Sequence, residues 1–258
     1  MGAALPGNAR GSVNEVRFHT LPDGRRIAYR HTPGSGPALV FLPGYMSDMA
    51  GGKATAVFDW AVAQGRECLL LDYAGCGGSE GLFADGTLSG WRGDVVCLLS
   101  ALCVHPVVLV GSSMGGWLML LVALELPLEI NALVGIAAAP DFTEWGFADE
   151  QKSGLAAGEI LYEDNPYGPE PTPTYPLFWA DGQANRLLDR EIPLLCPVRL
   201  VHGQADPDVP WELSLRLAKA LRSADVQVHL VKDGDHRLSR EQDIALLINV
   251  LSALPGVS

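Results

Sequence analysis

Residues 111–115 read Gly-Ser-Ser-Met-Gly and join a short apolar run at 107–110 to an apolar stretch at 116–121. This order predicts a strand, a sharp turn and a helix, with Ser113 on the turn. The glycines leave room for a backbone that a side chain would block, and the serine hydroxyl then projects above the sheet. The pattern predicts Ser113 as a nucleophile, although G-x-S-x-G alone also fits a glycine-rich turn with a surface serine.

Short apolar runs rich in Val, Leu and Ile recur along the chain, as in strands that are buried on both faces of a sheet. Helical patterns alternate with them, so we expect an α/β fold with a mostly parallel central sheet and helices on both faces. An alternating segment at 26–30, behind a turn at 21–24, predicts an antiparallel hairpin at the sheet edge. The apolar runs lie at 39–42, 68–71, 107–110, 132–136 and 198–201.

Residues 141–191 interrupt this alternation, and five prolines between positions 166 and 176 favour a loop with short helices there. We therefore expect a core at 1–140 and 192–258 with a lid insertion at 141–191. Eight aromatic residues gather in the insertion and form either a pocket wall or a small satellite core. They are Phe142, Trp145, Phe147, Tyr162, Tyr167, Tyr175, Phe178 and Trp179, and the predicted pocket residues among them are Trp145, Phe147, Phe178 and Trp179.

The formal net charge of −12 opposes binding to nucleic acid and to anionic membrane surfaces. No apolar run approaches the roughly 18 residues of a membrane span, and residues 1–12 lack the apolar centre of a secretory signal. These features predict a soluble, cytoplasmic protein without a membrane span. The five cysteines include no C-x-x-C motif, so we expect reduced thiols and no metal site.

A serine hydroxyl is a weak nucleophile at neutral pH, so Ser113 needs a histidine base and an acid that orients the histidine. Asp206 follows the run at 198–201 and falls at the carboxyl end of a strand, where catalytic groups gather in parallel sheets. His236 falls in a loop between an alternating strand and a capping box at 239–242 that begins the last helix. We expect Asp206 and His236 to complete a catalytic triad.

Two alternatives remain within this prediction. Asp208 could reach the same imidazole as Asp206. His202 is an alternative base, although a strand-end histidine bonded to backbone is the commoner arrangement. The remaining histidines lie in predicted strands or just before one and are not favoured: His19, His31, His105 and His229.

Attack by a serine on an acyl carbon also needs two backbone N–H groups that stabilise the charge developing on the substrate oxygen. Met114, the residue after the nucleophile, supplies one of them. Tyr45, in the loop after the strand at 39–42, supplies the other, and Gly44 allows the backbone to come close. We therefore expect an oxyanion hole formed by the N–H groups of Tyr45 and Met114.

Motifs at 42–47, 72–73, 91–95, 111–120, 202–211 and 235–237 together resemble the α/β-hydrolase superfamily over nearly the full chain. Within it, they resemble the subgroup of palmitoyl-protein thioesterases and acyl-glucuronide esterases. The resemblance implies an α/β-hydrolase fold and a cofactor-free serine hydrolase that cleaves hydrophobic acyl esters or thioesters through an acyl-enzyme. It implies a small-molecule or acylated-protein substrate, with Ser113 as nucleophile, Asp206 as acid and His236 as base.

The same triad also serves other chemistry in this fold. Acyl transfer, perhydrolysis and hydrolysis of a C–C bond are the first alternative function. A binding protein that has lost catalysis is the second.

Overall fold

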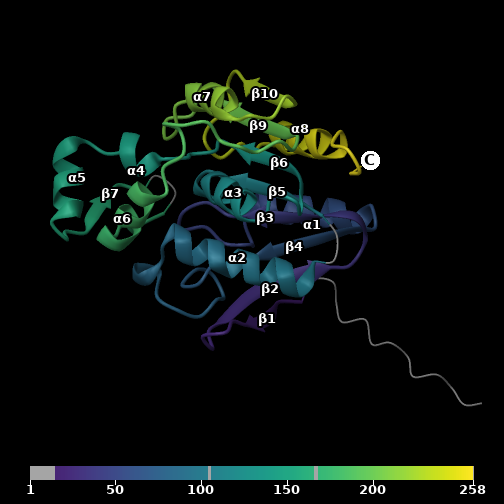
Figure 1. The fold of residues 1–258 in the computed structure, drawn as a ribbon, viewed down its shortest axis with the longest axis horizontal. Coiled ribbons are helices and arrows are strands. Elements are labelled where there is room, and N and C mark those ends of the chain that lie inside the picture. Colours follow the sequence, from purple (N-terminus) through teal and green to yellow (C-terminus); the bar gives the residue numbers. More distant parts are fainter. Residues whose placement is uncertain (1–14, 104–105, 166–167, 258) are drawn as a thin grey trace, which may run out of the picture.

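The computed structural model describes residues 15–103, 106–165 and 168–257, and an eight-stranded sheet forms the centre of this part (Figure 1). Its strand order is β1-β2-β4-β3-β5-β6-β9-β10. Neighbours from β4 to β10 are parallel, whereas β1 with β2 and β2 with β4 are antiparallel. The predicted parallel sheet with an antiparallel hairpin at its edge is confirmed. The strands are β1 (Arg17–Thr20), β2 (Arg26–Thr32), β3 (Ser35–Leu42), β4 (Arg66–Leu71), β5 (Val107–Ser112), β6 (Ile130–Ile136), β9 (Val198–Gly203) and β10 (Val226–Val231).

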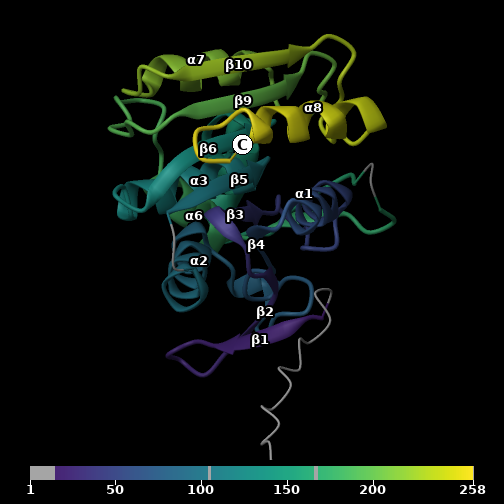
Figure 2. The same ribbon diagram turned by 90° about the vertical axis from the view of Figure 1, so that its right-hand side faces the viewer.

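Helices cover both faces of the sheet, which explains why every residue of β4, β5 and β9 is buried. Figure 2 shows α1 and α8 on one side, and α2, α3 and α7 on the other. Helix α3 is apolar all round and buried from Met114 to Ala123, so its first turn starts inside the core. The helices are α1 (Gly52–Ala63), α2 (Leu88–Leu102), α3 (Met114–Glu125), α7 (Glu212–Ala220) and α8 (Glu241–Ser252), with a short 3-10 helix at Phe83–Asp85.

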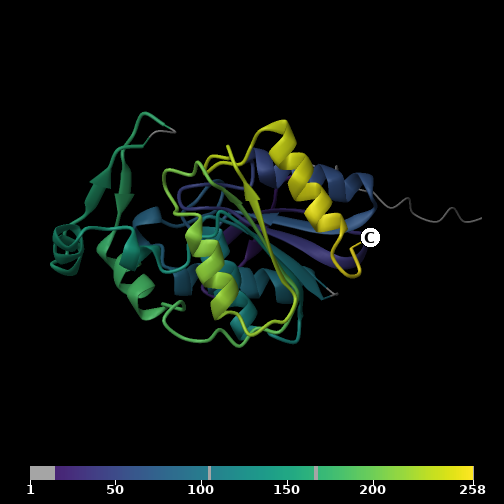
Figure 3. The ribbon, with the colours of Figure 1, turned by 90° about the horizontal axis from the view of Figure 1, so that it is seen from above.

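The segment between β6 and β9 lies at one end of the sheet in both Figure 1 and Figure 3. It contains α4 (Phe142–Trp145), α5 (Asp149–Ala156) and α6 (Pro176–Ala184), and also an antiparallel ribbon of β7 (Leu161–Glu163) with β8 (Thr172–Thr174). The prediction of a loop with helices missed this ribbon. Its strands are too short to show a period, and Pro173 argues against a strand, although a two-stranded ribbon tolerates it because each strand is an edge.

A buried carboxylate joins the beginning of this segment to residues near its end. Asp141, which directly precedes α4, is 4% exposed and accepts hydrogen bonds from the N–H groups of Leu187 and Leu188, at 2.8 and 2.7 Å. Burial raises the pKa of Asp141, while these two hydrogen bonds favour its charged form. The two ends of the segment are thereby held together beside the sheet.

Helix α8 begins one residue later than the predicted capping box requires. Arg240 is the N-cap, and its N–H donates to the carboxylate of Asp243 at 3.2 Å. Asp243 thus does what the prediction assigned to Gln242. His236 still lies in the loop between β10 and α8, as predicted.

Candidate active site

Ser113 lies on the turn between β5 and α3 in a backbone conformation that few side chains adopt. Its φ is 54° and its ψ is −119°, a strain that persists only where the surroundings hold it. The Ser113 N–H donates to the carbonyl of Ile136 at 2.9 Å, and the Ala139 N–H donates to the carbonyl of Ser113 at 3.1 Å. The predicted strand, turn and helix are present, with Ser113 just beyond the end of a central strand.

The glycines beside Ser113 are required by close packing. A Cβ at Gly111 would lie 2.3 Å from the carbonyl oxygen of Gly115, and a Cβ at Gly115 would lie 2.1 Å from the carbonyl oxygen of Leu42. Both contacts are with backbone atoms, which cannot rotate away as a side chain can. Helix α3 can approach β3 and β5 this closely only with glycine at both positions.

We expect Gly115→Ala to lower the free energy of unfolding by about 1–3 kcal/mol, the range for an overpacked core. Thermal unfolding measures the change. Gly93→Ala in α2 is the matched control, because a Cβ there meets nothing within 4 Å and alanine favours a helix over glycine by about 1 kcal/mol. Equal shifts of Tm in the two variants would contradict the close approach of α3 to β3.

Ser113, His236 and Asp206 come from the carboxyl ends of three different strands and form a continuous hydrogen-bonded chain. His236 Nε2 lies 3.1 Å from Ser113 Oγ, and His236 Nδ1 lies 2.9 Å from Asp206 Oδ2. A carboxylate only accepts hydrogen bonds, so Nδ1 carries the proton and Nε2 is left to accept from the serine hydroxyl. This tautomer can take a proton from Ser113.

Hydrogen-bond donors surround the carboxylate of Asp206 and keep it charged. Its side chain has no exposed surface, and its Oδ1 accepts from the N–H groups of Asp208 and Val209, both at 2.9 Å. Burial opposes ionisation, but the hydrogen bonds from His202 and His236 outweigh it and hold the pKa of Asp206 well below its usual range. A carboxylate that stays ionised can orient His236 and stabilise its protonated form.

His202, the alternative base in the sequence analysis, faces the acid instead of the serine. It is fully buried on β9, with Nε2 3.2 Å from Asp206 Oδ2 and 3.1 Å from the carbonyl of Val209. Its Nδ1 lies 2.7 Å from Ser214 Oγ. Both ring nitrogens are therefore engaged away from Ser113. Sequence reasoning missed this contact with the acid, although the spacing of four residues between His202 and Asp206 is a usable signal.

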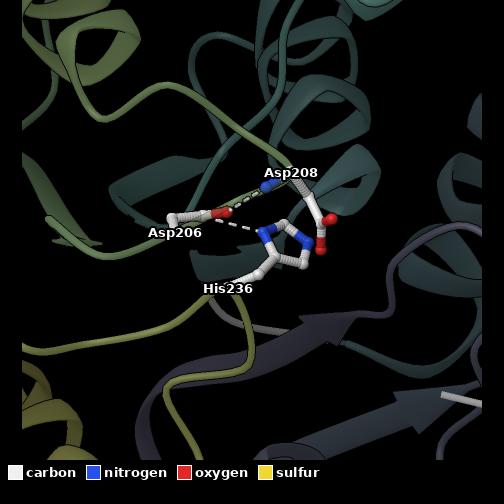
Figure 4. Close-up of side chains that lie close together, drawn as sticks. All are labelled: Asp206, Asp208 and His236. Carbon is white, nitrogen blue, oxygen red and sulfur yellow. Dashed lines mark hydrogen bonds and ion pairs between the residues drawn. The ribbon is translucent and has the colours of Figure 1, made fainter. Parts of the chain in front are cut away.

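Asp208, the alternative acid, does not occupy the place of Asp206. Its N–H donates to Asp206, and Figure 4 shows its side chain beside the imidazole of His236. Ligand atoms of Asp206, Asp208 and His236 all lie within 4.8 Å of one another. The two oxygens of Asp206 already meet two backbone N–H groups and two imidazoles, so this set fits a proton relay better than a metal site.

The backbone at Tyr45 and Met114 lines the same cavity as Ser113. Met114 is the first residue of α3, so its N–H has no partner within the helix. Among the described residues, the N–H groups of Tyr45 and Met114 donate no hydrogen bond to another residue. The Tyr45 hydroxyl donates to the carbonyl of Pro173 on β8 at 2.9 Å, which joins this loop to the segment at 141–191.

The cavity has a volume of about 590 Å³ and includes Ser113 and His236 in its wall. Phe142, Trp145 and Phe147 form an aromatic part of that wall. Of the predicted pocket residues, Trp145 and Phe147 thus line the cavity. Its size lies within the range of small-molecule sites.

Phe178 and Trp179 were also predicted to line the pocket, and the structure places both outside the cavity wall. Phe178 is 1% exposed and packs against the rings of Tyr45 and Trp91, at 4.8 and 5.6 Å between centroids. Trp179 donates from Nε1 to the carbonyl of Thr143 at 3.1 Å. Phe178 belongs to the main apolar core, and the hydrogen bond of Trp179 to Thr143 within the insertion fits the alternative of a satellite core. Tyr167, another member of the cluster, and His105, one of the candidate bases, lie outside the described residues.

Sequence reasoning gave no role to Lys53, which also lines the cavity. It is the second residue of α1, and its ammonium donates to the backbone carbonyl of Arg237, the residue after His236. A single lysine next to a glycine pair carries no signal in the sequence. Only the fold brings it to Ser113.

The sheet order, the serine on a strand-to-helix turn and the histidine before the last helix define an α/β hydrolase. Comparisons with known proteins agree. Residues 37–160 match a family model of the alpha/beta hydrolase fold, and residues 105–249 match one of the prolyl oligopeptidase family.

Relatives that match most of the chain narrow this class. The chain is 40% identical to the mouse mitochondrial palmitoyl-protein thioesterase ABHD10 over 95% of this chain and 83% of that protein. It is 36% identical to the human protein over 93% of this chain and 79% of that protein. The crystal structure of a putative hydrolase from Agrobacterium vitis has a TM-score of 0.87 and 37% identity, over 93% of this chain and 99% of that chain. The chain therefore belongs to the α/β-hydrolase family and, within it, to the ABHD10 family. It is a serine hydrolase with esterase or thioesterase activity.

The prediction of a cytoplasmic protein is wrong in the light of these relatives. The human and mouse proteins are mitochondrial, which points to an organellar location. Targeting segments act as addresses apart from the folded domain, so the composition of the domain carries little information about location. None of the described helices has both the length and the apolar character needed to cross a bilayer.

Proposed function

We propose that Ser113 is the nucleophile, His236 the general base and acid, and Asp206 the residue that orients His236. The unbroken chain of hydrogen bonds from Ser113 through His236 to Asp206, on the wall of a cavity, is the observation that carries this proposal. The same triad could also serve acyl transfer, perhydrolysis or C–C hydrolysis. These reactions are not favoured, because the human and mouse relatives are named as thioesterases.

In the first half of the reaction, Ser113 Oγ attacks the acyl carbon while His236 Nε2 takes the hydroxyl proton. The N–H groups of Tyr45 and Met114 stabilise the negative oxygen of the tetrahedral intermediate. His236 then gives the proton to the departing alcohol or thiol, and the bond from the acyl carbon to that leaving group breaks. Water repeats these steps on the acyl-enzyme, releases the acid and restores Ser113.

We further propose that residues 141–191 act as a lid over a core formed by 1–140 and 192–258. The direct pairing of β6 with β9 supports this division, because the sheet is continuous without the segment. The contribution of Phe142, Trp145 and Phe147 to the cavity supports a role of the segment in binding the acyl chain. The Tyr45–Pro173 hydrogen bond links its position to the oxyanion loop.

The substrate class proposed is a long-chain acyl thioester, including S-acylated protein. The aromatic wall supplies apolar surface for an acyl chain, and the human and mouse relatives are named palmitoyl-protein thioesterases. A fluorophosphonate probe tests the whole proposal. It is expected to label the protein on Ser113, and a palmitoyl thioester present during labelling is expected to slow the reaction; labelling of a different serine would contradict the assignment.

We expect kcat/KM for p-nitrophenyl or thiol esters to rise from acetyl to octanoyl. Each methylene that is buried against the aromatic wall contributes up to about 0.8 kcal/mol, which is nearly fourfold. Steady-state kinetics on the homologous series measure the slope. A maximum at acetyl would contradict an apolar acyl site.

Two variants test whether the aromatic wall of the cavity causes the dependence of kcat/KM on acyl chain length. Phe147→Ala removes an aromatic ring that lines the cavity and is expected to flatten the dependence on chain length. Tyr162→Ala is the matched control, because Tyr162 is 59% exposed and is not part of the cavity wall. The control is expected to keep the wild-type slope.

A further inference from the structure

Lys53 places a positive charge in the wall of the catalytic cavity. Its side chain is partly buried, and its ammonium donates to the backbone carbonyl of Arg237. Among the described residues, no carboxylate lies within the 4.0 Å of an ion pair with this ammonium. The cavity therefore contains a partly buried cation with unused hydrogen-bond capacity, since an ammonium has three donors.

The surroundings of Lys53 disfavour its charge. Burial and then the guanidinium of Arg237 lower the pKa of Lys53 to about 8, whereas Asp235, Asp243 and Asp206 act in the opposite direction from beyond ion-pair distance. A cation in such a site is stabilised when an anionic group of a ligand pairs with it. The electrostatics of the cavity wall thus favour an anion next to Lys53.

The reaction geometry indicates which part of a substrate this anion belongs to. His236 Nε2 must lie beside the leaving group, because it gives that group its proton. Lys53 contacts the residue directly after His236 and lines the same cavity, which favours the leaving group over the acyl chain as its partner. The aromatic rings that suit an acyl chain come from the insertion, at residues 142–147.

The acidic residues of the cavity restrict the anion further. Glu163, Asp164 and Asp208 also line it, and each carboxylate repels a negative ligand. An anionic group is therefore favoured close to Lys53 and its neighbour Arg237, which also lines the cavity, and disfavoured beside the three carboxylates. Such an arrangement selects for the position of the charge as well as its sign.

We propose that Lys53 forms a subsite for an anionic group, a carboxylate or a phosphate, on the alcohol or thiol that leaves the substrate. This proposal rests on the hydrolase mechanism above and adds the chemistry of the leaving group to it. Lys53 is a specificity-determining residue for that group. It pairs with the charge while His236 protonates the departing oxygen or sulfur.

Matched thioesters test the subsite. Butyryl-4′-phosphopantetheine and butyryl-pantetheine differ in the phosphate, and the butyryl thioesters of 3-mercaptopropionate and 3-mercaptopropionamide differ in the carboxylate. The measured quantity is the ratio of kcat/KM for the charged member to that for the neutral member of each pair. The pair with the larger wild-type ratio identifies which of the two leaving groups places its charge at the subsite.

Lys53→Gln removes the charge but keeps an N–H donor for the carbonyl of Arg237. We expect it to lower the ratio about tenfold, the size of one charge-assisted hydrogen bond. Lys53→Arg, which keeps the charge, is expected to retain most of the ratio. Lys219→Gln on α7 is the matched control, because Lys219 is exposed and outside the cavity.

The pH dependence of the ratio gives a second readout. Effects of pH on the catalytic steps are common to both members of a pair and cancel in the ratio. The ratio is expected to fall as the pH rises through about 8, where Lys53 loses its proton in the field of Arg237, Asp235, Asp243 and Asp206. In Lys53→Gln this fall is expected to be absent.

Three outcomes would overturn the subsite. An unchanged ratio in Lys53→Gln would contradict it while leaving the hydrolase mechanism intact. An equal loss on the charged and neutral thioesters would show that Lys53 only positions the loop after His236. Failure of the wild type to hydrolyse butyryl-pantetheine would contradict the proposed function, and the subsite with it.

Discussion

Replacing Ser113 by Ala is expected to lower kcat for a butyryl thioester by about 10⁶, the loss that follows removal of a triad nucleophile. Without the hydroxyl, His236 has nothing to deprotonate and no acyl-enzyme can form. Among the described residues, the Ser113 hydroxyl forms one hydrogen bond, with His236 Nε2, so the fold and Tm are expected to change little. Single-turnover and steady-state kinetics measure the loss.

Ser100→Ala is the control for Ser113→Ala. Ser100 is exposed on α2 and its hydroxyl donates only to the carbonyl of Val96, at 2.9 Å, so this variant is expected to behave as the wild type. Turnover of Ser113→Ala above about one hundredth of wild type, in protein freed of contaminating esterase, would contradict the nucleophile assignment.

Asp206→Asn is expected to lower kcat by about 10⁴ at neutral pH, because the amide favours the wrong tautomer of His236. The structure fixes the direction of that amide. Two backbone N–H groups point at Oδ1, so the carbonyl oxygen of Asn must take that position and the NH₂ group must face the imidazole. His236 Nδ1 then becomes an acceptor, and the proton moves to Nε2, where it blocks attack by Ser113.

Asp208→Asn separates the two candidate acids. Its side chain is exposed and its backbone N–H, which this change preserves, is what supports Asp206, so kcat is expected to fall by less than about tenfold. Measuring kcat and Tm for both Asn variants decides between the two carboxylates. An inactive Asp208→Asn together with an active Asp206→Asn would transfer the role of the acid to Asp208.

The sheet could be predicted from the sequence, and so could the three residues that meet at the carboxyl ends of its strands, because each of these features has a strong local signal. Apolar runs buried on both faces identify the central strands, and the carboxyl ends of parallel strands meet at one edge. Ser113 and Asp206 follow such strands in the sequence, and His236 follows the alternating strand β10. Chain order and topology together were therefore sufficient to place them side by side.

What the sequence could not predict depends on contacts between segments distant along the chain. Lys53 reaches the cavity only because α1 packs beside the loop that carries His236. Phe142 and Phe178 belong to the same aromatic cluster in the sequence. In the structure, Phe178 packs into the core, whereas Phe142 also borders the cavity. Strands of three residues, as in β7 and β8, are too short for a period to emerge.

The direct pairing of β6 with β9, from Leu133 with Val198 to Ile136 with Val201, has a consequence for evolution. The stretch of sequence between these strands can lengthen, shorten or be exchanged while the strands keep their register, provided that its ends still meet at Asp141. Under the proposed role of this segment, changes in the aromatic wall at Phe142, Trp145 and Phe147 can therefore accumulate without moving Ser113, Asp206 or His236. The preference for the acyl chain could then be inherited separately from the bond-breaking groups, whereas Lys53, on α1, belongs to the part of the fold around the sheet that keeps its register.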